Sequence, residues 1–320
     1  MKKVTALILA AMLVMVMLAA CGEAPAENTA APTPDVTAGA APLSAQGETD
    51  GDADSAAPKY VFLFIGDGMS YPQIQATADY LGALEDEDYM QAEPSLDDNG
   101  GAVLDGPVAL NFMNFEAAGS AVTYDSNSFA PDSASTATSI ATGFKTYSGS
   151  INVDETGTIE YETIAEKVHE QLGWKVGVIS SVNLNHATPA AFYAHQASRS
   201  SYYEIGLELV DSGFEYFAGG GLLSPEGYDE ANPSESLYDL AEEAGYTVTF
   251  DYASADEIGS GDKAILIDEY LADGDSIAYE IDRTDDMWSL ADYVEKGIEV
   301  LMNDTGFFMM CEGGKIDWAC

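Results

Sequence analysis

The strongest constraint on the fold is an unbroken run of large, β-favouring apolar residues at positions 60–65. Strands buried on both faces of a parallel sheet have such continuous runs, whereas half-buried strands alternate apolar with polar residues. Gly66-Asp67-Gly68 ends the run, and residues 71–80 have the composition of a helix. This segment therefore predicts a doubly buried strand, a tight glycine turn and a helix.

The same succession recurs along the chain. Further apolar runs and helical segments are found at residues 164–172 (helix), 174–180, 214–218, 264–267, 289–302 (helix) and 307–311. Alternating strands and helices without an internal repeat predict a three-layer α/β/α sandwich with a largely parallel central sheet. Ligands of such folds bind beyond the carboxyl ends of the strands. The candidate residues at those ends are Asp67, residues 183–188, Glu312 and Asp317.

The N-terminus has the pattern of an export signal. Met1-Lys2-Lys3 precedes an apolar run over residues 4–20, which ends in Leu18-Ala19-Ala20-Cys21. This ending is similar to a bacterial lipobox, which implies cleavage before Cys21 and its diacylation. An ordinary secretory signal and a single membrane-spanning helix are the alternatives, but the run is short for a span and neither explains the cysteine. We expect a signal peptide at 1–20 and an extracytoplasmic lipoprotein on a bacterial cell membrane.

The segment that follows is low in large apolar residues and rich in Ala, Pro, Thr, Ser, Gly, Asp and Glu. It cannot bury enough surface to offset its ordering entropy, so we expect a disordered tether at 21–58 that starts at lipidated Cys21. The folded region is then expected at 59–320. Cys311 lies within an apolar run and is expected to be a buried small side chain rather than a disulfide partner.

The charge balance excludes one class of partner. The chain has 55 acidic and 11 basic residues, for a formal net charge of -44. Nucleic-acid binding requires Lys and Arg against the phosphate backbone, so no nucleic-acid partner is expected. An acidic surface is a common means of solubility, but it also repels anionic substrates. A site for such a substrate would need local cations, either arginine or bound metal.

Residues 132–138 predict a helix that begins at about Ser133. A serine at this point has two interpretations. It can be an ordinary N-cap, or a nucleophile held where the helix N-terminus favours negative charge. On this segment alone the N-cap is the simpler interpretation.

Two other strand ends also leave alternatives open. Asp67 lies between two glycines, which suits a tight turn as well as a carboxylate that projects from the sheet. Thr188 is followed by Pro189 and could cap the next helix. Carboxylates and hydroxyls with few histidines suit a hard, oxygen-preferring cation such as Mg²⁺.

Taken in order, the motifs resemble the alkaline phosphatase family. They are residues 64–69 (FIGDGM), 132–147, 186–190 (HATPA), Ser198-Arg199, 219–221 (GGG) and 312–317 (EGGKID). Each motif alone could occur by chance, but the ordered set is specific and covers nearly all of residues 60–320. The resemblance favours the nucleophile over the N-cap at Ser133.

The resemblance implies a set of metal ligands. Ser133 is similar to the nucleophile that takes the phosphoryl group and contacts metal. Asp67 is similar to the carboxylate shared by one zinc and the magnesium. Thr188 and Glu312 are similar to the remaining magnesium ligands, and Asp317 to a ligand of the second zinc. Two Zn²⁺ and one Mg²⁺ are therefore implied for the complete protein.

The resemblance also implies how phosphate is held. Arg199 is similar to the guanidinium that binds two phosphate oxygens, a role suited to its planar fork. Asp132 would orient that arginine. His186 stands where family members carry Asp or His near the magnesium, as a second-shell or purely structural residue. His169 and His195 are expected to be structural.

These roles imply hydrolysis of phosphate monoesters through a covalent phosphoserine, in a protein that is often a homodimer. A superfamily phosphodiesterase is an alternative, although Asp132-Ser133-Ala134 and Arg199 favour monoesters. The alternative from a different class is a non-catalytic surface lipoprotein that binds phosphate or metal.

The family pattern leads to a prediction about activity. A zinc-binding histidine is expected four residues after Asp317, one position beyond Cys320, and an Asp-His pair and a further histidine later. We therefore expect a C-terminally truncated fragment with negligible phosphatase activity, because most zinc ligands are missing. Aryl phosphate hydrolysis by the purified chain with added zinc measures this. Robust zinc-dependent turnover would contradict the prediction.

Overall fold

The computed structural model describes residues 58–85 and 106–320, which belong to the compact unit Ala56–Cys320. The predicted signal peptide, the lipidation of Cys21 and nearly all of the predicted tether lie outside these residues and stay predictions. Within the described residues, no helix is both long and apolar enough to cross a bilayer.

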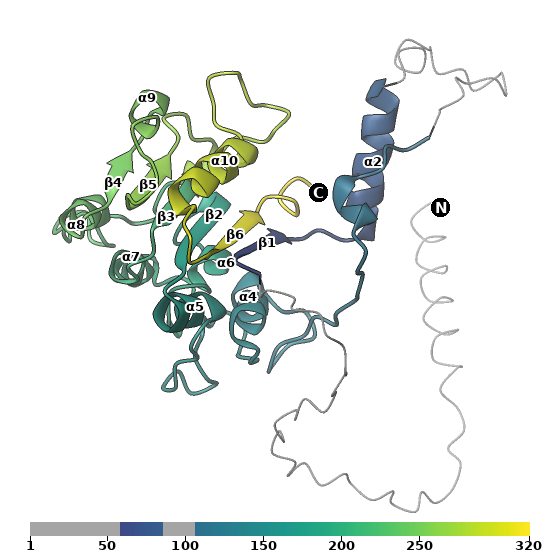
Figure 1. The fold of residues 1–320 in the computed structure, drawn as a ribbon. Helices are drawn as coiled ribbons and strands as arrows, with labels where there is room; N and C mark the ends of the chain where they lie inside the picture. Colours follow the sequence, from purple (N-terminus) through teal and green to yellow (C-terminus); the bar gives the residue numbers. More distant parts are fainter. Residues whose placement is uncertain (1–57, 86–105) are drawn as a thin grey trace, which may run out of the picture. The chain divides into compact units, whose positions relative to one another are not determined.

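The described chain forms a six-stranded sheet with helices before and after the strands (Figure 1). The strands are β1 (Tyr60–Gly66), β2 (Lys175–Asn183), β3 (Tyr216–Gly220), β4 (Thr247–Thr249), β5 (Ala264–Ile267) and β6 (Phe307–Gly313). The helices are α2 (Tyr71–Glu85), α4 (Ser133–Thr142), α5 (Ile164–Leu172), α6 (Ala187–Ala190), α7 (Tyr202–Asp211), α8 (Leu237–Glu243), α9 (Tyr252–Ala255) and α10 (Leu290–Leu301), with 3-10 turns η1 (Asn111–Asn114) and η2 (Asp273–Asp275).

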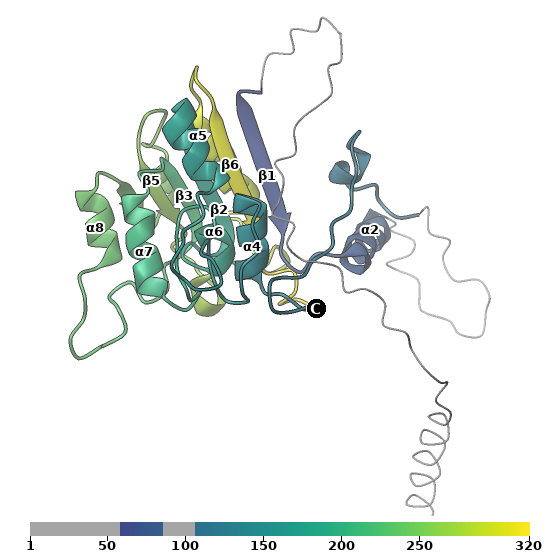
Figure 2. The same cartoon turned by 90° about the horizontal axis from the view of Figure 1, so that it is seen from below.

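All strand pairs are parallel, in the order β1-β6-β2-β3-β5-β4. Both faces of the central strands are buried. In β6, Phe308 and Met310 join a core shared with helices α4 to α8, whereas Phe307, Met309 and Cys311 join a second core beneath α10. Figure 1 shows α10 on one face of the sheet, and Figure 2 shows α4 to α7 along the other face. The predicted α/β/α sandwich is confirmed.

Strand β1 differs from its prediction. Val61, Leu63 and Ile65 pack against one core, but Phe62 and Phe64 on the opposite face are exposed, Phe64 by 63%. The reason is position: β1 is the edge strand of the described sheet, and α10 packs over β2, β3 and β6. The prediction of burial on both faces is correct for β2 and wrong for β1.

Parallel pairing brings the candidate site segments together. In the register of β1, β6 and β2, Glu312 lies beside Ile65 on one side and Ser180 on the other. The carboxyl end of each strand therefore lies at the same edge of the sheet. Asp67 follows β1 there, and the segment that leads to Thr188 follows β2.

The end of β3 provides a stability test. Gly219 has a φ of +138°, and a Cβ atom there would lie 1.8 Å from the backbone oxygen of Ser180. We expect Gly219→Ala to lower the free energy of unfolding by about 3 kcal/mol or more, because backbone on both strands must move. Gly245→Ala is the control: its φ is +93° but no atom lies within 4 Å, so about 1–2 kcal/mol is expected. Urea unfolding compares them, and equal losses would contradict the prediction.

Candidate active site

Asp132, rather than Ser133, is the N-cap of α4. Its backbone is extended, with φ of -105°, and its Oδ1 accepts a hydrogen bond from the Ser135 backbone N–H at 3.1 Å. Ser133 is the first residue of the helix, and its hydroxyl donates to Asp67 Oδ2 at 2.6 Å. The N-cap interpretation of Ser133 is therefore wrong. Its side chain joins a carboxylate 66 residues away in sequence.

Asp67 is the meeting point of two hydroxyls. Its Oδ2 accepts from Ser133 and also from Thr188 Oγ1, at 3.3 Å. The sequence left open that Thr188 caps a helix, but it does not. Helix α6 begins at Ala187, and His186 is in the N-cap position. Gly68, with φ of +76°, lets Asp317 approach, because a Cβ at Gly68 would lie 2.3 Å from Asp317 Cβ.

Glu312 is fully buried at the end of β6. Its Oε2 accepts from Ser180 Oγ at 2.5 Å, but its Oε1 has no hydrogen-bond partner among the described residues. Burial, opposed chiefly by the hydrogen bond from Ser180, raises the pKa of Glu312 to about 7. A buried carboxylate oxygen without a partner is costly, so this atom requires a proton or a cation.

Arg199 is held by a short ion pair. Its Nη1 donates to Asp132 Oδ2 at 2.9 Å, and its backbone N–H donates to the Gly149 oxygen at 2.7 Å. Gly149 in turn donates its N–H to Asp132 Oδ1 at 3.0 Å. Burial alone would raise the pKa of Asp132, but hydrogen bonds from Gly149 and Arg199 hold it below its ordinary value. Asp132 therefore fixes both the helix start and the guanidinium.

His186 is neutral at pH 7 in this site. Burial, and then the charge of Arg199, lower its pKa to about 4. Its Nε2 lies 3.4 Å from Arg199 Nη2, and the Trp318 ring meets it edge-on with centroids 6.3 Å apart. A neutral imidazole can accept a hydrogen bond from Arg199, so His186 contacts one terminal nitrogen of the guanidinium and Asp132 the other.

These residues line one cavity of about 770 Å³. The predicted site residues on its wall are Asp67, Asp132, Ser133, His186, Thr188, Arg199 and Asp317. Glu312 lies buried beside Ser180, and Cys21 is outside the described residues. The structure thus brings seven of the eight predicted site residues that it describes to one cavity. Within the described residues, there is no cluster of three or more His, Cys, Asp and Glu side chains placed to hold a metal.

Two contributors to this site were missed by the sequence reasoning. Ser180 holds Glu312, and the Gly149 N–H holds Asp132. A signal existed for Ser180, since it is a hydroxyl residue at the end of an apolar strand run. Gly149 had no comparable signal, because backbone donors are not visible in residue types.

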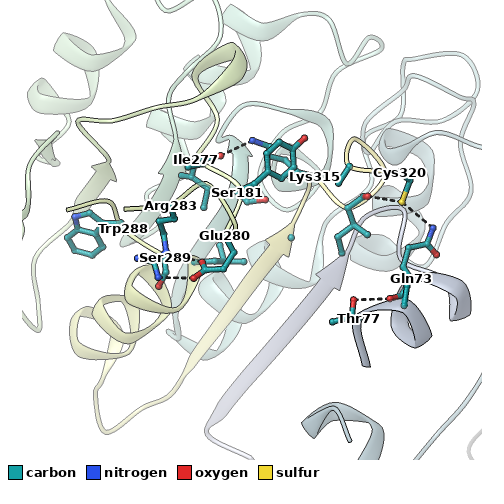
Figure 3. A pocket seen from close by; sticks show the side chains of 17 residues that line it. Gln73, Thr77, Ser181, Ile277, Glu280, Arg283, Trp288, Ser289, Lys315 and Cys320 are labelled. Atoms are coloured by element: carbon teal, nitrogen blue, oxygen red, sulfur yellow. Dashed lines mark hydrogen bonds and ion pairs between the residues drawn. The ribbon is translucent and has the colours of Figure 1, made fainter. Parts of the chain in front are cut away.

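A second cavity of about 460 Å³ lies between α2 and residues 277–290 (Figure 3). Lys315 is buried there; its Nζ donates to the Ile277 oxygen at 2.8 Å and to Ser276 Oγ at 3.0 Å. The same Nζ lies 3.8 Å from the centroid of the Tyr279 ring. None of the predicted site residues lines this cavity, so the candidate chemistry belongs to the first one.

Comparison with known families agrees with this arrangement. The family model described as alkaline phosphatase matches residues 58–213 and 265–320. The chain belongs to the alkaline phosphatase family. The resemblance predicted from the ordered motifs is confirmed.

Individual relatives show the extent of the likeness. Alkaline phosphatase 3 of Bacillus subtilis is 31% identical to this chain, over 86% of this chain and 54% of its own length. Alkaline phosphatase 4 of the same organism is 30% identical, over 83% of this chain and 53% of its own length. The chain thus spans about half the length of these relatives. A cold-active alkaline phosphatase from Shewanella sp. has a TM-score of 0.62 at 28% identity, covering 81% of this chain and 57% of that one. The alkaline phosphatase of the Antarctic bacterium TAB5 has a TM-score of 0.61 at 26% identity, and the match covers 82% of this chain and 67% of that one.

The double role of Asp132 leads to a prediction. Asp132→Asn keeps an N-cap acceptor but removes the charge that pairs with Arg199, so we expect a loss of about 1 kcal/mol in the free energy of unfolding at pH 7. Asp132→Ala also removes the cap, and should lose about 1 kcal/mol more.

The pH dependence provides the control. A lowered carboxylate pKa contributes stability that is present above the ordinary value of 3.8 and is lost as pH falls through the folded-state pKa. Urea unfolding at pH 7 and in acid should show the gap between parent and Asp132→Asn closing in acid. A gap that does not change with pH would contradict the assignment.

Proposed function

We propose that this chain carries the nucleophile, the phosphate-binding arginine and the magnesium ligands for hydrolysis of phosphate monoesters. The observation that carries the proposal is the 2.6 Å hydrogen bond from Ser133 Oγ to Asp67 Oδ2, in the cavity that Arg199 also lines. Because the chain spans about half of its relatives, the activity is proposed for the complete protein.

Magnesium fits the described residues. Asp67, Thr188 and Glu312 offer oxygen atoms, which a hard cation prefers. The buried Glu312 Oε1 has no hydrogen-bond partner among the described residues, and a cation would satisfy it in place of the proton that the raised pKa of about 7 favours. Solved variants of the TAB5 alkaline phosphatase hold magnesium in a site named M3. When bound here, the ion would supply positive charge next to Ser133 and lower the pKa of oxygen atoms that coordinate it.

Zinc does not fit the described residues alone. The predicted zinc ligands Asp67, Ser133 and Asp317 provide only oxygen, whereas zinc sites in proteins usually include nitrogen or sulfur. Among the described residues that line the cavity, His186 is the one imidazole, and its Nε2 faces Arg199. We therefore assign no step to zinc.

The chain's own residues support a two-stage transfer. Arg199 would bind two oxygens of the phosphate group through its planar fork, held by Asp132 and His186. Ser133 Oγ would attack phosphorus as its proton passes to Asp67 Oδ2, and the ester P–O bond would break. The leaving oxygen would take a proton from solvent and depart as an alcohol, and Asp67 would return its proton to solvent. Water would then cleave the Oγ–P bond of the phosphoserine and restore the Ser133 hydroxyl.

The electrostatics explain why such a site needs metal. The cavity wall carries one guanidinium, Arg199, against the carboxylates of Asp67, Asp132 and Asp317. The formal net charge of the whole chain is -44. A phosphate dianion would be repelled by this field unless cations neutralise the carboxylates.

The remaining sequence predictions are part of the proposal. Attachment to a bacterial cell membrane through Cys21 and a homodimer are proposed for the complete protein. A non-catalytic surface lipoprotein that binds phosphate is the alternative, and the Ser133–Asp67 contact favours the enzyme over it.

The nucleophile is tested by Ser133→Ala in the complete protein. We expect aryl phosphate turnover to fall by at least about 10³-fold, because no phosphoserine can form. Metal binding should be kept, since Asp67, Thr188 and Glu312 are unchanged. Turnover that persists in this variant would show that another group attacks phosphorus.

The magnesium ligands are tested on the 320-residue chain itself by thermal unfolding. Added Mg²⁺ should raise the melting temperature of the parent, because a ligand that binds only the native state stabilises it. Glu312→Gln keeps the shape of the side chain but removes its charge, and should abolish the response. Ser180→Ala is a matched control that leaves the carboxylate in place and should still respond. An equal response in parent and Glu312→Gln would refute the site.

A further inference from the structure

His195 lies between helices α5 and α7. Its Nε2 is 3.5 Å from Glu166 Oε2 on α5, and its Nδ1 is 3.6 Å from Glu208 Oε2 on α7. The side chain is 14% exposed, so the cluster is partly shielded from water. The carbonyl of Tyr161, from the loop before α5, also lies 3.2 Å from Nε2. One imidazole therefore bridges two carboxylates and a backbone oxygen.

The carboxylate of Glu208 also holds the backbone around His195. Its Oε2 accepts from the His195 N–H at 2.6 Å, and its Oε1 accepts from the side chain of Gln196. Gln196 and Ile151 exchange both backbone hydrogen bonds, at 2.8 and 3.0 Å. The chain is thus fixed at two successive residues directly before the segment that carries Arg199.

That segment continues into the candidate active site. Arg199 follows His195 by four residues, and its N–H donates to the Gly149 oxygen at 2.7 Å. The Gly149 N–H donates to Asp132, the same carboxylate that pairs with the guanidinium. A continuous set of contacts therefore leads from His195 to Arg199 and to the start of α4.

The charge of the cluster depends on a proton on His195. Burial disfavours the imidazolium, but hydrogen bonds and charge from Glu166 and Glu208 outweigh it and raise the pKa of His195 to about 10. Without that proton, two carboxylates would face an uncharged ring. Glu166 also accepts from the Thr163 N–H at 2.8 Å and closes the capping box of α5, so its position is fixed from both sides.

We infer that the imidazolium of His195, clamped between Glu166 and Glu208, is a positioning residue that places Arg199 for phosphate; this rests on the proposed function. A bidentate guanidinium must be held within a fraction of an ångström and a few degrees of its productive geometry. Asp132 and His186 fix the tip of Arg199, whereas the His195 cluster fixes the backbone from which its side chain extends.

A merely structural role would be to join α5 to α7. His169 provides the matched control for it, because it lies on α5 and its Nε2 is 3.4 Å from Glu215 Oε1. Its ring packs edge-on against Phe214. His195→Gln removes two histidine–glutamate pairs and His169→Gln removes one, but only the first substitution lies in the segment that leads to Arg199.

Hydrogen exchange on the 320-residue chain tests positioning independently of activity. In His195→Gln we expect the amides of Gln196 and Arg199 to exchange at least about tenfold faster, while amides of β2 and α10 keep the parent rate. His169→Gln should leave residues 195–201 at the parent rate. Parent-like exchange at these amides in His195→Gln, or an equal rise over the whole sheet, would overturn the inference.

Kinetics on the complete protein test the consequence. In His195→Gln, KM for an aryl phosphate and the inhibition constant of inorganic phosphate should rise together, by about tenfold, with a smaller fall in kcat. The raised pKa of His195 contributes folding stability that is fully present below pH 6.5 and is lost as the pH rises through about 10. The difference in the free energy of unfolding between the parent and His195→Gln should therefore narrow above that pH.

The two arms separate the possible failures. Unchanged KM and phosphate inhibition in an active His195→Gln enzyme would overturn the inference and leave the proposed function standing. No turnover in the complete parent protein would refute the proposed function, and the exchange measurement would still decide whether His195 holds the Arg199 segment.

Discussion

The parallel alignment of β1, β6 and β2 is the constraint on which the site depends. Because the three strands run in the same direction, Asp67, Glu312 and the segment leading to Thr188 leave the sheet at one edge. The N-terminus of α4 lies at this same edge, where Ser133 contacts Asp67. Residues separated by tens to hundreds of positions form one cavity without any irregular strand pairing between β1 and β6.

Asp132 converts that framework into a defined geometry. One of its oxygens caps α4 and receives the Gly149 N–H, and the other binds Arg199. The start of the helix that carries Ser133 and the guanidinium of Arg199 are thus both positioned by one carboxylate. The His195 cluster supports the same arrangement from outside the cavity, through the backbone that precedes Arg199. Such layered support is what keeps the members of a catalytic site at fixed distances.

The electrostatics of the site are unfavourable without a bound cation. Three carboxylates face one guanidinium in the cavity, and Glu312 is buried with one oxygen unsatisfied. Lys315, a buried charged group outside this cavity, is matched by hydrogen bonds to Ile277 and Ser276. Proteins tolerate unsatisfied groups mainly where function requires them. A bound cation would resolve both features at once, which agrees with the proposed magnesium dependence.

The sequence by itself determined the sandwich, the bounds of α5, the family and the candidate residue types, because apolar runs and ordered motifs are properties of the linear chain. Only the tertiary structure decided that Asp132 caps α4, that Thr188 turns to Asp67 and that Ser180 holds Glu312. It also decided that one face of β1 is exposed, since burial depends on strand order and on where α10 packs. Local patterns do not encode strand order, so contacts such as Ser180–Glu312, 132 residues apart, could not be predicted from them.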